Sequence, residues 1–204
     1  MIAIIDFGLG NVNSVHRALK HLNIPSVVTK VPSEILSCEK IILPGVGSFA
    51  EASKRMFTSG MANLLIDCAR ARKKPLLGIC LGMQLLAEEG EEGGRAPGLG
   101  LVKACVSRIR QKDSSFRLPH IGWNDVSSRG MKLFSGVQEG SSFYFVQSYE
   151  MILREENVSH VTTQYGIDIV VAVKKDNVVG VQFHPEKSQK DGLLILKNFA
   201  QGHY

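Results

Sequence analysis

Short apolar runs alternate with segments of helical periodicity in the first half of the chain. The apolar runs lie at 2–5, 27–28, 41–43 and 76–79, and they are rich in β-branched residues. Apolar positions recur at helical spacing at 12–22, 49–57 and 61–71, between these runs. Continuously apolar strands separated by helices are typical of a parallel sheet that is covered on both faces.

The second half of the chain has a different pattern, in which short candidate strands follow one another with turn residues between them. We expect these strands near 101–109, 123–127, 142–146, 160–164, 168–174 and 177–182. Asp176 and Asn177 indicate a hairpin turn between the last two. A helical run at 83–88 leads into the acidic stretch 88–94, which we expect to be an exposed loop, and a final helix is expected near 190–201. The pattern therefore predicts one α/β domain, residues 1–204, with a mixed, mainly parallel sheet flanked by helices and an antiparallel extension.

Composition and charge exclude several classes of protein. The 204 residues are 44% apolar and 21% charged, which is ordinary for a globular domain and unlike a disordered or fibrous chain. The net charge of +5 comes from scattered residues without an aromatic-interleaved basic stripe, so we expect no nucleic-acid partner. Glycine is the outlier, because 20 glycines are about one residue in ten, against a usual share of roughly 7%. That excess suggests tight turns and backbone that lies close to a ligand.

The cysteines and the first residues bear on the compartment. Cys38, Cys68, Cys80 and Cys105 form no CxxC pair, which favours free thiols in a reducing compartment. The apolar residues at 2–5 follow no basic leader, and no apolar run approaches the length of about 18 residues that a membrane helix needs. We therefore expect a cytoplasmic protein without membrane association. No cluster of histidines and cysteines has the spacing of metal ligands, so no metal is predicted.

The strongest local signal for chemistry is the stretch GICLG at 78–82, which lies between an apolar strand and a helical run. Glycines two residues before and two residues after Cys80 permit the strained strand-to-helix turn that presents a nucleophile at the end of a sheet. The free backbone amides and the dipole of a helix N-terminus favour a thiolate and can hold an oxyanion. A structural cysteine beside packing glycines is the alternative, and the flanking pattern favours the nucleophile.

A thiol nucleophile needs a base, and the base needs an acceptor that orients it. The stretch QFHPE at 182–186 supplies both after an apolar strand, because Glu186 can accept the proton of one ring nitrogen of His184 while the other nitrogen faces the thiol. The alternative is a surface histidine stiffened by Pro185. The remaining histidines lack such surroundings and are expected to be structural or surface residues: His16, His21, His120, His160 and His203.

Two further glycine-containing turns follow predicted strands. Gly45 and Gly47, in PGVGS at 44–48, can free backbone amides to face a developing negative charge, although a plain tight turn is an equal alternative. The stretch GLGN at 8–11 is similar to a dinucleotide-binding turn, but Asn13 stands where a third glycine is required. No ribose-binding acid follows at the right distance either, so we exclude NAD and predict no cofactor.

Taken together, the nucleophile turn, the PGVG turn and the His-Pro-Glu stretch resemble the class I glutamine amidotransferases. Within that family, seven stretches resemble the glutaminase subunits of imidazole glycerol phosphate synthases, in the same order and across essentially the whole chain. These are DFGLGN (6–11), LPGVGSF (43–49), GICLGMQ (78–84), PGLGL (97–101), LPHIGWN (118–124), YFVQSY (144–149) and QFHPEKSQ (182–189). The resemblance implies the flavodoxin-like α/β fold of that family.

The resemblance also implies roles for individual residues. Cys80 would attack the side-chain carboxamide of glutamine to give a glutamyl thioester and ammonia, His184 would move the protons, and Glu186 would hold the tautomer of His184. Backbone amides of the oxyanion hole would come from Val46, Gly47 and Leu81. Positions that bind glutamine would be Gln84, Glu92, Ser148 and Tyr149. Positions at the interface with the partner would be Asn11, Trp123 and Lys187.

The implied partner is a (β/α)₈-barrel synthase subunit that forms a heterodimer with this chain and receives ammonia through its interior. Hydrolysis would depend on that partner, which fits an oxyanion turn at 45–47 that is able to flip. The chain departs from the family at Gln147, where a histidine is usual, and at Lys103 and Ala104, where Pro-Gly is usual.

Two alternatives stay open at the level of the sequence. A paralogous glutaminase would supply ammonia to an enzyme that builds amidino groups on bacterial surface sugars. A protein of another class would be a catalytically idle module that binds a partner, but such a module has no need of Cys80, His184 and Glu186 together. An independent thiol hydrolase would not require Gln84 or the YFVQSY stretch.

Overall fold

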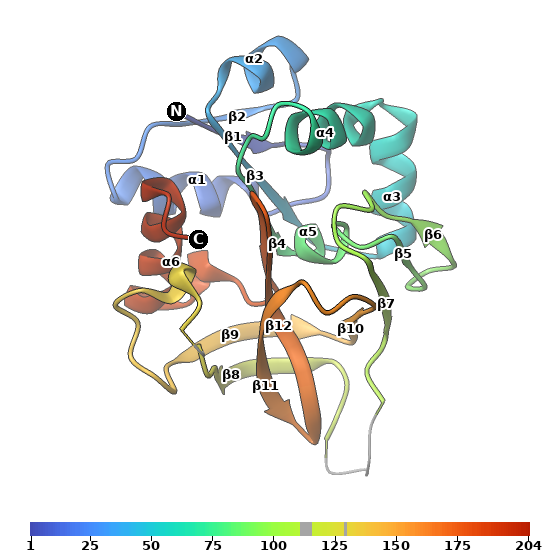
Figure 1. Ribbon diagram of the computed structural model, residues 1–204, viewed down its shortest axis with the longest axis vertical. Coiled ribbons are helices and arrows are strands. Elements are labelled where there is room, and N and C mark those ends of the chain that lie inside the picture. Colours follow the sequence, from blue (N-terminus) through green and yellow to red (C-terminus); the bar gives the residue numbers. More distant parts are fainter. Residues whose placement is uncertain (111–115, 129) are drawn as a thin grey trace.

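A computed structural model describes residues 1–110, 116–128 and 130–204. A seven-stranded sheet forms its centre (Figure 1), in the order β11-β12-β13-β4-β3-β1-β2. These strands are β1 (Ile2–Ile5), β2 (Ser26–Thr29), β3 (Lys40–Gly45), β4 (Leu76–Cys80), β11 (Ser159–Tyr165), β12 (Ile167–Lys175) and β13 (Val178–Val181). The five strands from β13 to β2 run parallel, whereas β12 and β11 are antiparallel. The predicted parallel sheet with an antiparallel extension is therefore confirmed.

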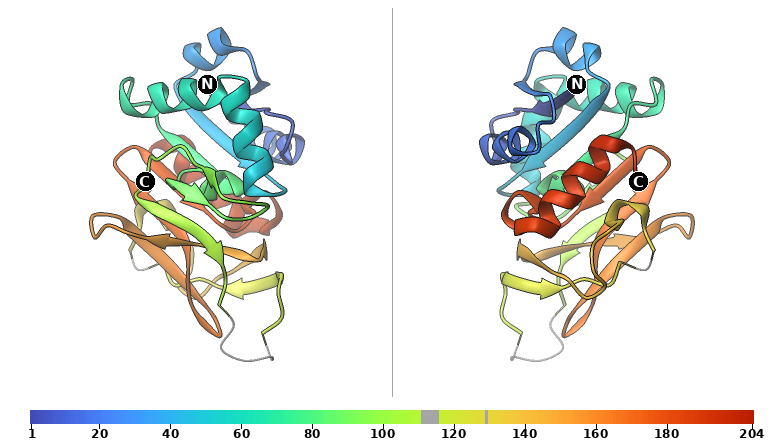
Figure 2. Two further views of the ribbon diagram at one scale, coloured as in Figure 1. Left: turned by 90° about the vertical axis from the view of Figure 1, so that its right-hand side faces the viewer. Right: turned by 90° about the vertical axis from the view of Figure 1, so that its left-hand side faces the viewer.

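Helices cover both faces of this sheet (Figure 2). On one face lie α1 (Val12–His21) and α6 (Gln189–Gln201). On the other face lie α2 (Pro32–Ser37), α3 (Phe49–Thr58), α4 (Met61–Arg70) and the short α5 (Leu81–Gln84). No helix among the described residues is both long enough and apolar enough to cross a bilayer.

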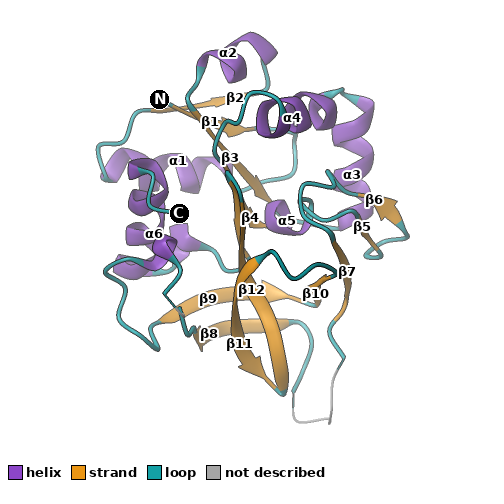
Figure 3. Cartoon of the chain, in the orientation of Figure 1, coloured by secondary structure: helices purple, strands orange, loops and turns teal. Residues whose placement is uncertain are grey.

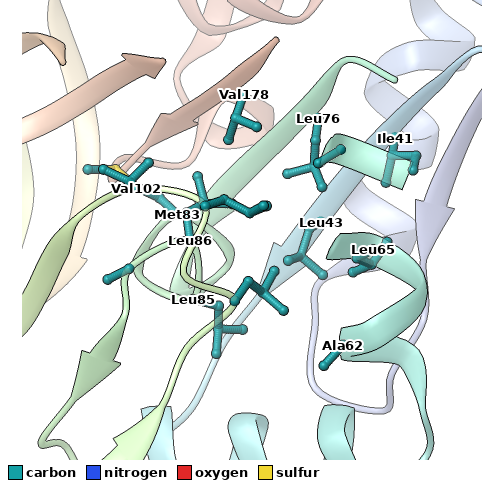
Figure 4. Packing of buried hydrophobic residues seen from close by; sticks show 14 of the residues in the cluster. Ile41, Leu43, Ala62, Leu65, Leu76, Met83, Leu85, Leu86, Val102 and Val178 are labelled. Carbon is teal, nitrogen blue, oxygen red and sulfur yellow. The ribbon is translucent and has the colours of Figure 1, made fainter. Parts of the chain in front are cut away.

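The core explains why the parallel strands in the middle of the sheet are mostly apolar. Successive side chains of a strand point to opposite faces, so Leu43 packs toward α4 while Ile42 packs toward α1 and α6. Figure 4 shows Leu43 and Leu76 of the sheet beside Ala62 and Leu65 of α4. Because both faces are buried, neither set of positions can be polar.

Two smaller sheets stand beside the central one (Figure 3). One contains β10 (Tyr149–Leu153), β7 (Ala104–Arg108), β5 (Glu89–Gly90) and β6 (Ala96–Pro97), and the other pairs β8 (His120–Asp125) with β9 (Ser142–Gln147). Three of the strands expected in the second half, at 101–109, 123–127 and 142–146, therefore belong to these small sheets instead of extending the main one.

One element was missed and two other expectations need correction. The short helix α2 was not predicted, because Ile35 is its one buried residue and gives no periodicity. The helix expected at 83–88 ends at Gln84, since the carbonyls of Leu85 and Ala87 accept hydrogen bonds from the returning chain at Leu99 and Gly100. The stretch 88–94 is not simply an exposed loop, because it contains the paired strand β5 and packs against α3.

Candidate active site

The nucleophile turn has the strained geometry that its glycines predict. Cys80 ends β4 with φ 55° and ψ −114°, and α5 begins at the next residue. A Cβ atom on Gly82 would lie 1.8 Å from the carbonyl oxygen of Leu43, and one on Gly78 would lie 2.5 Å from the carbonyl oxygen of Gly82. Since no side chain fits at either position, the close approach of β3, β4 and α5 at Cys80 depends on both glycines.

The histidine reaches the thiol because β13 and β4 are neighbouring parallel strands whose carboxyl ends meet at one edge of the sheet. His184 lies just beyond β13, lines the same pocket as Cys80 and interacts with the Cys80 side chain. Its Nδ1 lies 2.9 Å from Oε1 of Glu186, which belongs to the 3₁₀ turn η2 (Pro185–Lys187). The Glu186 side chain is buried, and its Oε2 has no hydrogen-bond partner among the described residues.

Backbone contacts tie this histidine to strand β9. The amide of His184 donates to the carbonyl of Tyr144, 2.9 Å away. The buried hydroxyl of Ser188 donates to the carbonyl of His184 and accepts from the amide of Tyr144. The His184 loop and β9 therefore hold one another in place.

The protonation of His184 follows from these contacts. Burial alone lowers its pKa, but the hydrogen bonds with Cys80 and Glu186 favour the charged ring more strongly and raise the pKa of His184 to about 10. The imidazole therefore keeps its second proton at neutral pH. A protonated histidine beside a cysteine is the arrangement that favours an ion pair with a thiolate.

A pocket of about 420 Å³ opens at Cys80 and His184. It brings together all four predicted glutamine-binding residues and all three predicted oxyanion residues. Its described lining is Val46, Gly47, Ser48, Cys80, Leu81, Gln84, Glu92, Pro119, Val146, Gln147, Ser148, Tyr149 and His184. Glu92 is half-buried there, and burial raises the pKa of its carboxyl group against the opposing effect of the Phe49 amide.

The two sides of the expected oxyanion hole differ in their hydrogen bonding. Leu81 opens α5, and the first amides of a helix have no acceptor within the helix. The amide of Val46, in contrast, donates to the carbonyl of Leu9 at 3.3 Å. The Val46 peptide must rotate before its N–H can face the pocket, and Gly47 beside it has φ +104°, a backbone conformation that favours glycine.

Comparison with known proteins identifies the family. The family model "Glutamine amidotransferase class-I" matches residues 3–201. The chain belongs to this family. A curated relative from Moorella thermoacetica, imidazole glycerol phosphate synthase subunit HisH, is 46% identical over 98% of this chain and 94% of its own length. The subunit of the same name from Leptospira interrogans is 41% identical over 98% of this chain and 99% of its own.

Solved structures confirm the fold of this amidotransferase. A crystal structure of a glutamine amidotransferase superimposes with a TM-score of 0.75 at 21% identity, covering 98% of this chain and 97% of the other. PurLQS from Thermotoga maritima gives a TM-score of 0.72 at 18% identity and covers 98% and 97% of the two chains. The chain is thus a glutamine-hydrolysing enzyme with the flavodoxin-like fold of class I amidotransferases.

Two of the three predicted interface residues, Trp123 and Lys187, lie next to strand β9, whose Val146 lines the amidotransferase pocket. Trp123 and Ile121 on β8 are 48% and 60% exposed, and they pair with Tyr144 and Val146 on the outer face of β9. The ring of Tyr144 lies 6.1 Å from that of Trp123, and Nζ of Lys187 lies 5.6 Å from the Tyr144 ring centre. These five side chains, called the outer β8–β9 face below, include two of the three predicted contacts.

The third predicted contact, Asn11, is the N-cap residue of α1 and closes the loop whose Leu9 carbonyl binds Val46. It therefore lies near the oxyanion turn instead of on the outer β8–β9 face. His120 is structural, as expected, because it is buried and stacks on Phe145 and Tyr165, and burial lowers its pKa to about 4.

Sequence reasoning assigned no role to several residues at this site. The thiol of Cys80 contacts the side-chain amide of Gln182 and the carbonyl of Val146. Pro119 and Gln147 line the pocket. All of them lie within the stretches that carry the family resemblance, which was the available signal. Only the arrangement of the strand ends, where Cys80 of β4 meets Gln182 after β13 and Val146 of β9, shows what they touch.

A larger pocket of about 750 Å³ lies between the end of β1 and the α3–α4 turn. The described residues that line it include neither a cysteine nor a histidine, so the smaller pocket is the candidate for catalysis. Over the described ranges, no group of three or more acidic, histidine or cysteine side chains is arranged to hold a metal ion.

Proposed function

We propose that this amidotransferase is the glutaminase subunit of an imidazole glycerol phosphate synthase. The observation that carries the proposal is the pocket in which Cys80 and His184 meet every residue expected to bind glutamine. The relatives from Moorella, Leptospira and Campylobacter all have the name of this subunit, and each aligns with 98% of the chain. That agreement favours the histidine pathway over a surface-sugar pathway.

The proposed reaction begins at the Cys80–His184 pair. The thiolate attacks the carboxamide carbon of glutamine, and the oxygen of the tetrahedral intermediate takes up the negative charge near the amide of Leu81. His184 then gives its Nε2 proton to the departing nitrogen, the C–N bond breaks, and ammonia leaves a glutamyl thioester. His184 next removes a proton from water, which attacks the thioester and releases glutamate and the thiolate.

Glu186 orients the base in this scheme. Its Oε1 accepts from Nδ1 of His184, so the other ring nitrogen is the one that exchanges protons with sulfur and substrate. Gln84, Glu92, Ser148 and Tyr149 form the wall that holds the amino-acid end of glutamine. Glu92 provides the negative charge that an α-ammonium group requires.

The partner proposed for the outer β8–β9 face is a (β/α)₈-barrel synthase subunit. Large exposed apolar side chains on the strand pair that reaches the pocket at Val146, with Lys187 next to Tyr144, suit a surface that another protein covers. Ammonia released under such a cover would pass to the partner without becoming ammonium in bulk water. Docking near Asn11 would also act on the loop that holds the Val46 amide, which connects partner binding to the oxyanion hole.

The proposal is tested by measuring glutamate release from glutamine with the subunit alone and with the barrel subunit and its nucleotide ligand. We expect slow release by the isolated subunit, a large increase in the complex, and no release by Cys80→Ala. Release that is unchanged in Cys80→Ala would overturn the assignment of the nucleophile.

The acceptor of the ammonia is tested separately by complementation of a bacterial histidine auxotroph that lacks this subunit, with Cys80→Ala as the inactive control. Growth without histidine supports the proposed pathway. Failure to grow, combined with active glutamine hydrolysis, would favour the surface-sugar pathway over the histidine pathway. A cytoplasmic location is part of the same proposal, because the pathway uses phosphorylated intermediates.

A further inference from the structure

We infer that Gln182 is a positioning residue of the nucleophile, whose side-chain amide donates a hydrogen bond to Cys80 Sγ and favours its thiolate form. The inference rests on the proposed role of Cys80 and goes beyond the Cys-His-Glu triad. Gln182 is fully buried at the end of β13, and its Nε2 lies 3.7 Å from Sγ. That separation is within the range of hydrogen bonds to sulfur, which is a larger atom than oxygen.

The orientation of the Gln182 amide is fixed by its neighbours. Its Oε1 accepts a hydrogen bond from Nε2 of Gln84 at 3.0 Å, so its own NH₂ group must face the sulfur. The second hydrogen of the Gln84 amide goes to the carbonyl of Tyr149 at 3.3 Å. Both amides are therefore oriented by hydrogen bonds, and Gln182 cannot turn its oxygen toward Sγ without breaking the one from Gln84.

The contacts of Sγ differ between its two protonation states. As a thiol, Sγ can donate to the carbonyl of Val146, 3.8 Å away. As a thiolate it has no proton to donate, and that carbonyl then presents a partial negative charge to it. The amide of Gln182 and the ring of His184 are donors, so both favour the thiolate. Gln182 thus acts on the same equilibrium as His184, but without a titratable group.

Gln84 also lines the glutamine pocket, so this chain of amides connects the pocket wall with the nucleophile. Loss of the Gln84 amide would leave Gln182 free to rotate, and half of the resulting orientations place an oxygen against the sulfur. Gln84 therefore acts on Cys80 through Gln182, although Gln84 itself makes no hydrogen bond with Sγ.

The test is the pH dependence of Cys80 alkylation by iodoacetamide in the full chain, followed by mass spectrometry of the Cys80 peptide. Gln182→Met keeps the length of the side chain and removes both of its hydrogen bonds. We expect the midpoint of the alkylation profile to rise by about one pH unit, which means about tenfold less thiolate below the midpoint. The alkaline plateau should persist, because a thiolate of higher pKa is at least as nucleophilic. An unchanged midpoint would overturn the inference.

Three comparisons separate this role from a merely structural one. Gln84→Met should raise the midpoint by a smaller amount, and the Gln84→Met, Gln182→Met double variant should match Gln182→Met alone. Gln147→Met, the matched control, removes a buried amide that donates to the same Tyr149 carbonyl without touching the sulfur. Its midpoint should stay at the wild-type value, and a shift as large as that of Gln182→Met would refute a specific contact.

The same experiment tells the failure of the proposed nucleophile from the failure of this inference. Cys38, Cys68 and Cys105 are internal references, because all are free thiols. If wild-type Cys80 is alkylated at neutral pH no faster than these three, the proposed role of Cys80 is wrong. If Cys80 is selectively alkylated but the midpoint of its pH profile is the same in wild type and Gln182→Met, the assignment of Cys80 as nucleophile is supported and the inference on Gln182 is wrong.

Discussion

The strained backbone at Cys80 leads to a prediction about stability. With φ 55° and ψ −114°, Cys80 occupies a conformation that is unstrained only for glycine. Such strain costs on the order of 1–3 kcal/mol. Cys80→Ala and Cys80→Gly both remove the thiol and its hydrogen bonds, so the two variants differ only by a Cβ atom and by the backbone freedom of glycine. We predict that the usual stability disadvantage of glycine relative to alanine disappears at this position.

The magnitude follows from a comparison with an ordinary helix position. Lys54 lies exposed in the middle of α3, where glycine should be about 1 kcal/mol less stable than alanine. At position 80 the relief of about 2 kcal/mol of strain opposes the entropic penalty of glycine, about 1 kcal/mol as at position 54, and the loss of one buried methyl group, worth about 0.8 kcal/mol. The unfolding free energy of Cys80→Gly should therefore equal that of Cys80→Ala or exceed it by up to about 1 kcal/mol. The glycine-minus-alanine difference in unfolding free energy should therefore be about 1–2 kcal/mol more favourable at position 80 than at position 54.

The assay is urea denaturation of four variants, Cys80→Ala, Cys80→Gly, Lys54→Ala and Lys54→Gly, with unfolding free energies from linear extrapolation. For a chain of this size, 1 kcal/mol corresponds to roughly 2–4 °C in Tm, so thermal denaturation gives an independent check. If glycine is less stable than alanine by the same amount at both positions, Cys80 stores no strain and the reasoning is refuted.

Three further predictions concern the site and its surroundings. The pKa of His184 is raised above 6.5, to about 10, so the stability that its protonated ring contributes is complete below pH 6.5 and is lost as pH rises through 10. Glu186→Gln should therefore lower the unfolding free energy at pH 6. In urea titrations the difference in unfolding free energy between this variant and wild type should shrink by pH 10. Gly82→Ala places a Cβ 1.8 Å from the Leu43 carbonyl, and we expect a loss of at least about 2 kcal/mol in the same assay; wild-type stability would contradict the close approach. Trp123→Ala should weaken binding of the barrel subunit by at least tenfold in titration calorimetry. Its Tm should stay within about 2 °C of the wild-type value, because the Trp123 side chain is half-exposed. An unchanged affinity would exclude Trp123 from the interface.

Local patterns predicted the central sheet well. The strands β1 and β4, and β3 after its first residue Lys40, contain no charged or amide side chains because both faces of the sheet are covered, and that signal needs no knowledge of distant residues. Strand β10 gave no comparable signal, since Glu150 and Met151 are adjacent and both buried, which breaks the alternation expected of a strand. The separation of β7–β9 into small sheets depends on pairing between distant segments, and no local pattern specifies such partners.

The site was predictable only as far as residue types reveal chemistry. Cys80 with its flanking glycines, and His184 with Glu186, could be paired from their positions at strand ends. The hydrogen bond from the Val46 amide to Leu9 was not predictable, because it depends on the orientation of a peptide plane and not on a side chain. The role of Gln182 was hidden for a related reason, since a glutamine beside an apolar strand has no distinctive spacing.

Strand β9 has a consequence for how the protein moves. Among the described strands, β9 pairs with β8 alone, and a two-stranded sheet is of marginal stability by itself. Transient separation of this pair in the free subunit would leave β9 less restrained, and His184, whose amide is bonded to the Tyr144 carbonyl of β9, would share that motion. Amide hydrogens of β8 and β9 should therefore exchange with deuterium sooner than those of β4 in the middle of the central sheet, and a bound partner should slow them. The lifetime of the paired state would then limit the time for which each molecule is competent to react.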